Sequence, residues 1–147
     1  MSGLSISSME ICDDRNMDVV ENLENVDVLI LSGGHVPTQN RFMKDLRLKE
    51  RLADFNGIVI AWSAGSMNCA DINIFPHFQT IREDYLDGMR IIEDITFEDS
   101  VGHEIIALNE ESYIMIEDGK ATLYGEAYRI KDRQITQICR DGEWGVM

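Results

Sequence analysis

The sequence has few basic residues, and this shortage excludes a first class of function. Its 147 residues include 13 Lys and Arg against 27 Asp and Glu, which gives a formal net charge of −14. Such a chain would repel a nucleic acid, because binding normally depends on counterion release to a basic face. Anionic membrane surfaces are disfavoured for the same reason. We therefore expect neither a nucleic acid nor a membrane as a partner.

Cysteines and long apolar runs are also scarce. Cys12, Cys69 and Cys139 are odd in number, widely separated and without C-x-x-C spacing, so neither a disulfide framework nor a structural zinc site is predicted. The longest apolar runs, at residues 28–31 and 58–62, are too short to cross a bilayer. The N-terminus lacks the pattern of a targeting segment. We expect a cytoplasmic protein with no metal and no cofactor.

The remaining composition is that of an ordinary globular protein. Hydrophobic residues make up 44% of the chain and charged residues 27%, which is far from the profile of disorder. A chain of this length buries about 68–70% of the surface that its unfolded form exposes. One domain over residues 1–147 is therefore the natural count.

The first half of the chain alternates strand and helix. The apolar runs at residues 26–31 and 58–62 predict strands buried on both faces. Gly57 suits the left-handed position that follows a helix. The order of strand, helix and strand predicts a parallel β-α-β unit. The predicted helix has Thr38 as its candidate N-cap, and its apolar residues recur at helical spacing: Phe42, Leu46, Leu48, Leu52 and Phe55.

The second half is richer in short strands. Residues 82–95 predict a helix, because an apolar stripe runs from Tyr85 to Ile95 at roughly helical spacing. The Asp118-Gly119 pair and residues 131–133 predict tight hairpin turns. Together the two halves predict an α/β fold, a parallel sheet with a C-terminal antiparallel hairpin region. The predicted strands after Glu104 are residues 105–108, 113–116, 121–124, 128–130 and 135–139.

The strongest candidate for chemistry is a serine between small residues. Residues 61–65, Ala-Trp-Ser-Ala-Gly, have the form of G-x-S-x-G with Ala in the first position. They stand where a predicted strand passes into a short helix at residues 66–70, which is the setting of a nucleophile elbow. Such a turn exposes Ser63 Oγ at the edge of the sheet, and the Ala64 N–H would face a developing oxyanion. The alternative is a small-residue turn that serves packing alone.

A glycine loop ends the other predicted strand at the same edge of the sheet. Ser32-Gly33-Gly34 lets the backbone approach a ligand closely, and the Gly34 N–H is a candidate second oxyanion donor. The alternatives are a turn with no ligand and a phosphate cradle. Neither G-x-G-x-x-G nor a Walker pattern is present, so nucleotide binding has little support.

His77 is the candidate general base. It lies fourteen residues after Ser63, in Phe-Pro-His-Phe. A helix that leaves the elbow, followed by an extended return at residues 72–75, would bring it back to the same edge. The alternative is a histidine packed between two aromatic rings. His35 fits a loop-shaping or pocket role, and His103 an exposed loop.

These motifs together resemble peptidase family S51, the serine peptidases that include aspartyl dipeptidase (peptidase E) and cyanophycinase. The resemblance runs from about Asp27 to the C-terminus. It implies the fold of class I glutamine amidotransferases, a flavodoxin-like parallel sheet, with Ser in place of the Cys nucleophile. The likeness is carried by Ser32-Gly33-Gly34 with Gln39, by residues 62–66, by Pro76-His77-Phe78 and by residues 119–125.

The resemblance also implies an activity, the hydrolysis of a small peptide, such as one with an N-terminal Asp. Arg82 is similar to the family arginine that binds the acidic side chain of the substrate, and the alternative is a surface ion pair with Glu83 or Asp87. Trp62 either roofs the pocket or packs. The implied catalytic residues are Ser63 as nucleophile, His77 as general base and the N–H groups of Gly34 and Ala64 as oxyanion hole, with Gly33 beside the substrate.

Two differences from the family pattern lead to further expectations. The family has a strand-helix portion ahead of the glycine-loop strand, whereas only residues 1–26 precede that position here. The interval between nucleophile and histidine, which carries the family's triad acid, is short. Asp71 is its one carboxylate, and it is expected at the far end of the helix from Ser63. The other candidates for the orienting acid are Glu83, Asp84, Glu104 and Glu126.

The sequence thus leaves two functions open. The first is a serine peptidase that forms an acyl-enzyme on Ser63. The second is a shortened, non-catalytic amidotransferase-like module that binds a small ligand or a partner chain. Without the family's first strands, residues 26–31 would expose an apolar edge or face, and we expect a second copy to cover it in a homodimer.

Overall fold

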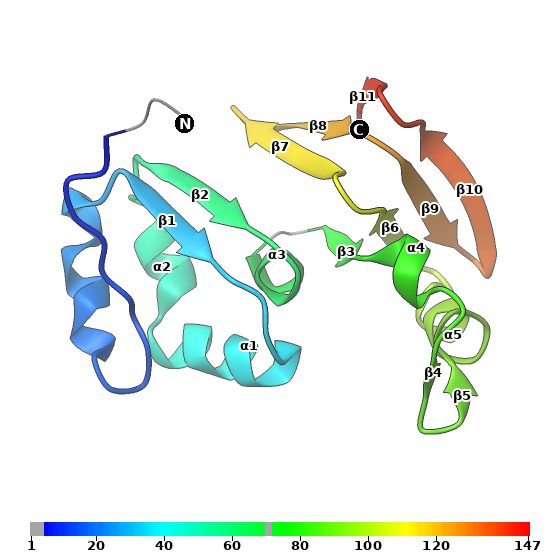
Figure 1. Ribbon diagram of the computed structural model, residues 1–147, viewed down its shortest axis with the longest axis horizontal. Coiled ribbons are helices and arrows are strands. Elements are labelled where there is room, and N and C mark those ends of the chain that lie inside the picture. Colours follow the sequence, from blue (N-terminus) through cyan, green and yellow to red (C-terminus); the bar gives the residue numbers. More distant parts are fainter. Residues whose placement is uncertain (1–4, 70–71) are drawn as a thin grey trace.

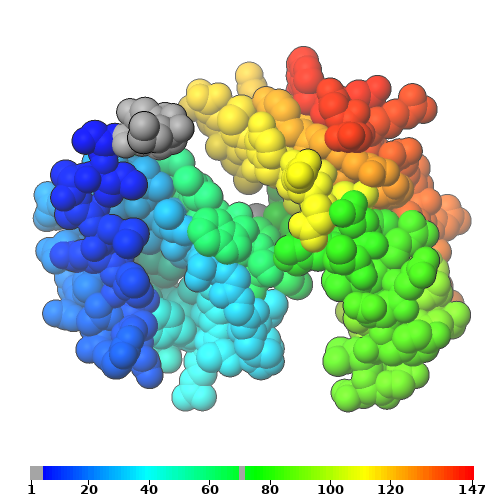
Figure 2. Space-filling view, in the orientation of Figure 1, coloured from blue at the N-terminus to red at the C-terminus, as the bar shows by residue number. Residues whose placement is uncertain are grey.

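The computed structural model describes residues 5–69 and 72–147, and it is a mixed α/β protein with two halves along its long axis (Figure 1). Figure 2 shows the surface hollowed between these halves. The N-terminal half holds η1 (Met17–Asn25), β1 (Val28–Leu31), α1 (Val36–Asp45), α2 (Leu48–Leu52), β2 (Ile58–Ala61) and α3 (Ala64–Cys69). The C-terminal half begins with β3 (Asn73–Phe75), α4 (Phe78–Ile81), β4 (Tyr85–Leu86), β5 (Met89–Arg90), η2 (Ile91–Thr96) and α5 (Phe97–Asp99). It continues with β6 (Glu104–Leu108), β7 (Tyr113–Glu117), β8 (Lys120–Tyr124), β9 (Ala127–Lys131), β10 (Gln134–Cys139) and β11 (Trp144–Val146).

The predicted parallel unit is confirmed, but its burial is not. β1 and β2 pair in parallel, with Leu31 opposite Ala61. Helices cover one face of the pair, where Leu31 packs in a cluster with Val20, Leu46 and Leu48. The other face is open, since Ile30 is 51% exposed. The prediction of strands buried on both faces is wrong, because within the described residues these helices pack on one side only.

The helix predicted between the two strands is a pair of helices. α1 begins at Val36, ahead of the predicted cap at Thr38, because Pro37 suits a first turn, where an N–H has no helical acceptor. The Thr38 hydroxyl instead lies 2.8 Å from His35 Nδ1. Arg47, with φ of 52°, interrupts the helix, and α2 follows it.

Two glycines let the backbone of β2 and α3 approach β1 closely. A Cβ on Gly57 would lie 2.5 Å from the carbonyl oxygen of Asp27, and one on Gly65 would lie 2.1 Å from that of Leu31. Neither glycine has a positive φ. The predicted left-handed conformation of Gly57 is therefore wrong, and the glycine is needed for space instead.

The helix predicted at residues 82–95 is replaced in its first half by a hairpin. β4 and β5 pair antiparallel around Asp87 and Gly88, whose φ values are 51° and 82°. Two consecutive positive φ values are typical of the tight turn that joins antiparallel strands. The helical turns begin only at Ile91. The Asp-Gly turn thus prevails over the helical spacing of the apolar residues.

The five strands predicted after residue 104 are confirmed, and β11 was not predicted. One sheet has the order β10-β9-β6-β3, in which β3 runs parallel to β6, and a second has the order β11-β8-β7. Asp118-Gly119 forms a hairpin turn as predicted, with φ of 50° and 72°. Ile106 and Leu123 belong to a common core between the two sheets. Within the described chain, no helix is both long enough and apolar enough to span a membrane.

Candidate active site

Ser63 lies at the abrupt turn from β2 into α3. Its φ of 52° is left-handed, a conformation that costs a residue with a side chain about 1–3 kcal/mol. The Gly65 N–H donates to the Trp62 carbonyl at 3.0 Å, and the Met67 N–H donates to the Ser63 carbonyl at 3.2 Å. These bonds start α3 immediately after the serine. A strained serine between a strand and a helix is the backbone geometry of a nucleophile elbow.

The glycine loop packs directly against Ser63. A Cβ on Gly33 would lie 3.2 Å from Ser63 Cβ, 3.4 Å from Ser63 Oγ and 3.8 Å from the Trp62 ring. Ala64 is 1% exposed, whereas Trp62 is 50% exposed. The structure thus brings Gly33, Trp62 and Ser63 together, and Gly34 and Ala64 are their immediate neighbours in the chain.

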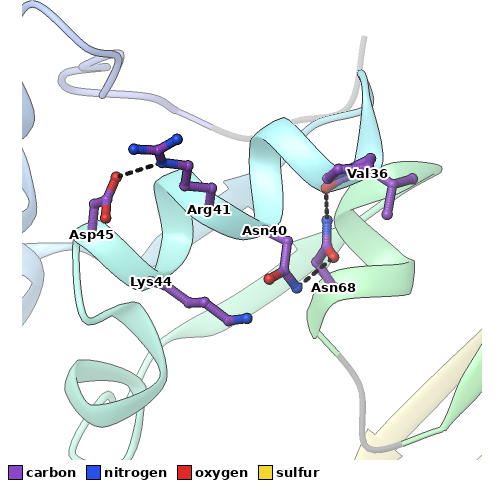
Figure 3. A pocket seen from close by; sticks show the side chains of 7 residues that line it. Val36, Asn40, Arg41, Lys44, Asp45 and Asn68 are labelled. Atoms are coloured by element: carbon purple, nitrogen blue, oxygen red, sulfur yellow. Dashed lines mark hydrogen bonds and ion pairs between the residues drawn. The ribbon is translucent and has the colours of Figure 1, made fainter.

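Amide side chains from α1 and α3 hold the glycine loop in place. Gln39 Nε2 donates to the Ser32 carbonyl at 2.6 Å, and Asn68 Nδ2 donates to Gln39 Oε1 at 3.0 Å. Asn68 Nδ2 also donates to the Val36 carbonyl at 3.2 Å, and Asn40 Nδ2 donates to Asn68 Oδ1 at 3.0 Å (Figure 3). The loop is therefore fixed relative to the helix that follows the elbow. Sequence patterns gave no role to Asn68.

An open pocket of about 490 Å³ lies between α1 and α3. Asn40 and Asn68 meet on its wall, and Arg41 faces Asp45 at 4.0 Å (Figure 3). Neither Ser63 nor His77 lines it, so it is not the place of the predicted chemistry. Its lining residues are Val36, Pro37, Asn40, Arg41, Lys44, Asp45 and Asn68.

His77 lies in the C-terminal half, directly before α4. Its φ is 59°, and its side chain is 44% exposed. Nδ1 lies 2.7 Å from Glu110 Oε1. An ionised carboxylate only accepts hydrogen bonds, so a neutral His77 carries its proton on Nδ1 and leaves Nε2 as an acceptor. This is the form that a general base needs.

Glu110 is the site residue that sequence patterns did not identify. It follows β6, and His77 follows β3, the parallel neighbour of β6, so the carboxyl ends of both strands meet at one edge. That strand pairing is the signal that could have found it. None of the four other candidate acids bonds His77 within the described chain, and Asp71 lies outside the described residues. Those four are Glu83, Asp84, Glu104 and Glu126.

Arg82 directly follows α4, and its charge lies over an aromatic ring of that helix. Its Cζ lies 5.5 Å from the centroid of the Phe78 ring, a distance at which a cation is attracted to the ring face. Among the residues described, Arg82 makes no ion pair, so neither Glu83 nor Asp87 neutralises it. Its guanidinium remains open to a carboxylate.

The predicted site residues form two separate groups. Ser63 lies between β2 and α3, which belong to the N-terminal half, whereas His77 and Arg82 flank α4, which belongs to the C-terminal half (Figure 1). No hydrogen bond or ion pair joins Ser63 to His77 in residues 5–69 and 72–147. Nor does this part of the chain hold a group of three or more His, Cys, Asp or Glu side chains that could bind a metal ion.

Comparison with known proteins adds no relative to this picture. No protein-family model matches the chain, and no curated protein matches it.

Proposed function

We propose that this chain is a serine hydrolase similar to the S51 peptidases, which cleaves an amide bond in a small acidic peptide. The observation that carries the proposal is the left-handed backbone of Ser63, with Gly33 packed against its side chain. A strained residue persists only where the surrounding structure over-determines it, and such strain clusters at functional sites. Gly65, pressed against the Leu31 carbonyl, supplies that constraint here.

The proposed mechanism gives each residue one step. Ser63 Oγ attacks the carbonyl carbon of the peptide while His77 Nε2 takes the hydroxyl proton. The N–H groups of Gly34 and Ala64 stabilise the oxyanion of the tetrahedral intermediate. His77 then gives the proton to the leaving amine, and water hydrolyses the acyl-enzyme on Ser63. Each transfer requires His77 Nε2 to come within hydrogen-bond reach of Ser63 Oγ once substrate is bound.

Two further residues complete the proposal. Glu110 accepts the Nδ1–H of His77 at 2.7 Å and thereby keeps the ring in the tautomer that the mechanism uses. Arg82 binds the acidic side chain of the substrate, because a guanidinium pairs with a carboxylate in a planar, bidentate geometry.

The resemblance to the S51 family extends the proposal to the fold and location. The parallel pair β1–β2, with its glycine loop and elbow, supports a flavodoxin-like, amidotransferase-like sheet. Residues 1–147 then form one S51-like domain of a cytoplasmic protein that needs no metal or cofactor.

Labelling with a fluorophosphonate probe tests the proposal, because the probe reacts only with an activated serine. We expect the intact chain to be labelled, and Ser63→Ala and His77→Ala to abolish labelling. His103→Ala is the matched control, since His103 is an exposed histidine with no assigned role. Separate, unlabelled protein is then tested for release of amino acid from Asp-X dipeptides. Absence of labelling in the intact chain would contradict the proposal.

A second candidate is a non-catalytic module that binds a ligand or a partner chain. Two observations favour it: no hydrogen bond joins Ser63 to His77 in the described chain, and an apolar face of β1 and β2 is open to solvent. On that face Ile30 is 51% and Ile58 63% exposed. Dipeptide turnover that is lost in Ser63→Ala would refute this candidate.

A further inference from the structure

Glu126 is the centre of a hydrogen-bond cluster beside the His77–Glu110 pair. Its carboxylate accepts from Asn109 Nδ2 at 2.7 Å, from Gln137 Nε2 at 3.2 Å and from the Tyr128 hydroxyl. Asn109 is only 8% exposed, and its amide must turn its nitrogen toward the carboxylate. Three donors to one charged acceptor hold the Glu126 side chain in a single position.

The backbone of Glu126 holds the turn that carries Glu110. Its carbonyl accepts from the Asn109 N–H at 3.1 Å and from Ser112 Oγ at 2.8 Å. The Ser112 N–H donates to the Asn109 carbonyl at 3.3 Å, which closes a turn over residues 109–112. Both ends of this turn are therefore bound to one residue, and Glu110 lies between them.

A second connection runs from Glu126 to the histidine. Tyr128, whose hydroxyl donates to Glu126, packs its ring 5.1 Å from the ring centroid of Phe78. Phe78 is 1% exposed and directly follows His77 in the chain. Glu126 thus contacts residues that hold Glu110 and His77 in place, although it bonds to neither of these two side chains.

We propose that Glu126 is a positioning residue, which sets the geometry of the His77–Glu110 hydrogen bond and through it the tautomer of His77. The two paired side chains are 44% and 43% exposed, and an exposed pair gains little from its own attraction while it loses side-chain entropy. Such a pair keeps its geometry only if neighbouring residues already hold both side chains in position. The catalytic consequence rests on the proposed function, whereas the tautomer is a property of the free protein.

The variants are designed around the Asn109–Glu126 bond. Glu126→Gln leaves two amide nitrogens facing each other, so one amide must turn. Either the Gln turns away from Tyr128 and Gln137, or the Asn109 amide turns and buries its nitrogen where its oxygen now has no partner among the described residues. When Asn109→Asp is added, the new carboxylate accepts from the nitrogen of the introduced Gln. The oxygen of that Gln still accepts from the Tyr128 hydroxyl. Glu117→Gln is the matched control, because Glu117 is an exposed glutamate on β7 outside the cluster. Tyr128→Phe, which removes one donor and keeps the ring, serves if Glu126→Gln fails to fold.

The first readout is the tautomer of neutral His77, measured from its ¹⁵N ring shifts in histidine-labelled protein and assigned with His77→Asn. We expect both Glu126→Gln and Glu110→Gln to lower the Nδ1–H fraction, and the double variant of Glu126→Gln with Asn109→Asp to restore it. Tyr128→Phe should lower it less. An unchanged fraction in Glu126→Gln or, failing that variant, in Tyr128→Phe would overturn the proposal, even if the melting temperature falls.

The second readout is the rate of fluorophosphonate labelling at Ser63. We expect Glu126→Gln to slow it by about 100-fold, the loss typical of a catalytic group displaced by about 1 Å, and the double variant to recover most of it. An unlabelled intact chain would contradict the proposed hydrolase, and the tautomer measurement would then decide the role of Glu126 by itself. A normal rate in a folded Glu126→Gln would overturn the proposal.

Discussion

His77 Nδ1 lies 2.7 Å from Glu110 Oε1, although 33 residues separate the two in the chain. They meet because β3 and β6 are parallel neighbours, with Phe75 opposite Ala107, and each residue follows the end of its strand. The pair is about half exposed. A pair in this position adds little to folding stability, so removing it tests the proposed function without unfolding the protein.

We predict that Glu110→Gln lowers activity and leaves stability nearly unchanged. The amide cannot hold His77 Nδ1–H as firmly, and loss of the orienting acid costs about 10⁴-fold in the well-studied serine proteases. The fluorophosphonate labelling rate measures the loss, and the urea midpoint measures stability. Glu111→Gln, at the exposed neighbouring residue, should behave like the intact chain. Equal labelling rates for both variants would contradict the assigned role.

We predict that Gly65→Ala destabilises the protein, because its Cβ would lie 2.1 Å from the Leu31 carbonyl oxygen. Relief requires α3 to move away from β1, at a cost of about 1–3 kcal/mol. Urea unfolding measures the change. Gly145→Ala is the matched control, since its Cβ would meet nothing within 4 Å. Similar stabilities of the two variants would show that this contact does not constrain the elbow.

The Arg90–Asp94 pair should make stability depend on pH in acid. Hydrogen bonds from Arg90 lower the pKa of Asp94 to about 2. Because the folded pKa lies below that of the unfolded chain, about 3.9, the contribution is present above pH 4 and is lost as pH falls toward 2. Thermal melting of the intact chain and Asp94→Asn should therefore differ at pH 7 and converge near pH 2. Asp99→Asn, at an exposed aspartate, is the control; a gap that persists at pH 2 would contradict this origin.

The open face of β1 and β2 should mediate self-association. Its four apolar side chains, which are 44–63% exposed, form a contiguous patch of the kind that marks an interface. We expect light scattering to give a dimer for the intact chain and a monomer for Ile30→Glu. Ile6→Glu, at a residue 76% exposed outside the strands, should stay dimeric. A monomeric intact chain would contradict the expectation. The four residues are Val28, Ile30, Ile58 and Ile60.

Local signals in the sequence predicted local structure well. The Asp118-Gly119 turn, whose two residues have positive φ values, and the short strands on either side of it were predicted from the Asp-Gly pair and from the short strand-like runs that flank it. Asp87-Gly88 carries the same turn signal, but the helical spacing from Tyr85 to Ile95 concealed it. The Asp-Gly pair is the stronger predictor there, because it favours the positive φ values of a tight turn. The spacing of apolar residues indicates only which face of a helix would be buried.

Features that depend on distant pairing were not predictable from the sequence. Glu110 reaches His77 only because β3 pairs with β6, and no local pattern states that pairing. The open face of β1 and β2 depends likewise on how many elements pack around the pair. The tight turn at Ser63 and the approach of the Gly33 loop were predictable, because a short run of small residues encodes this kind of backbone shape.

The pairing of Leu31 with Ala61 also determines where the chain tolerates added length. One extra residue between α2 and β2 would enlarge a loop and leave the strands aligned. One extra residue between Leu31 and Gly33 would carry the glycine away from Ser63, since the two touch only in the present alignment. An insertion before β2 should thus be tolerated, whereas an insertion between Leu31 and Gly33 would separate the glycine loop from Ser63.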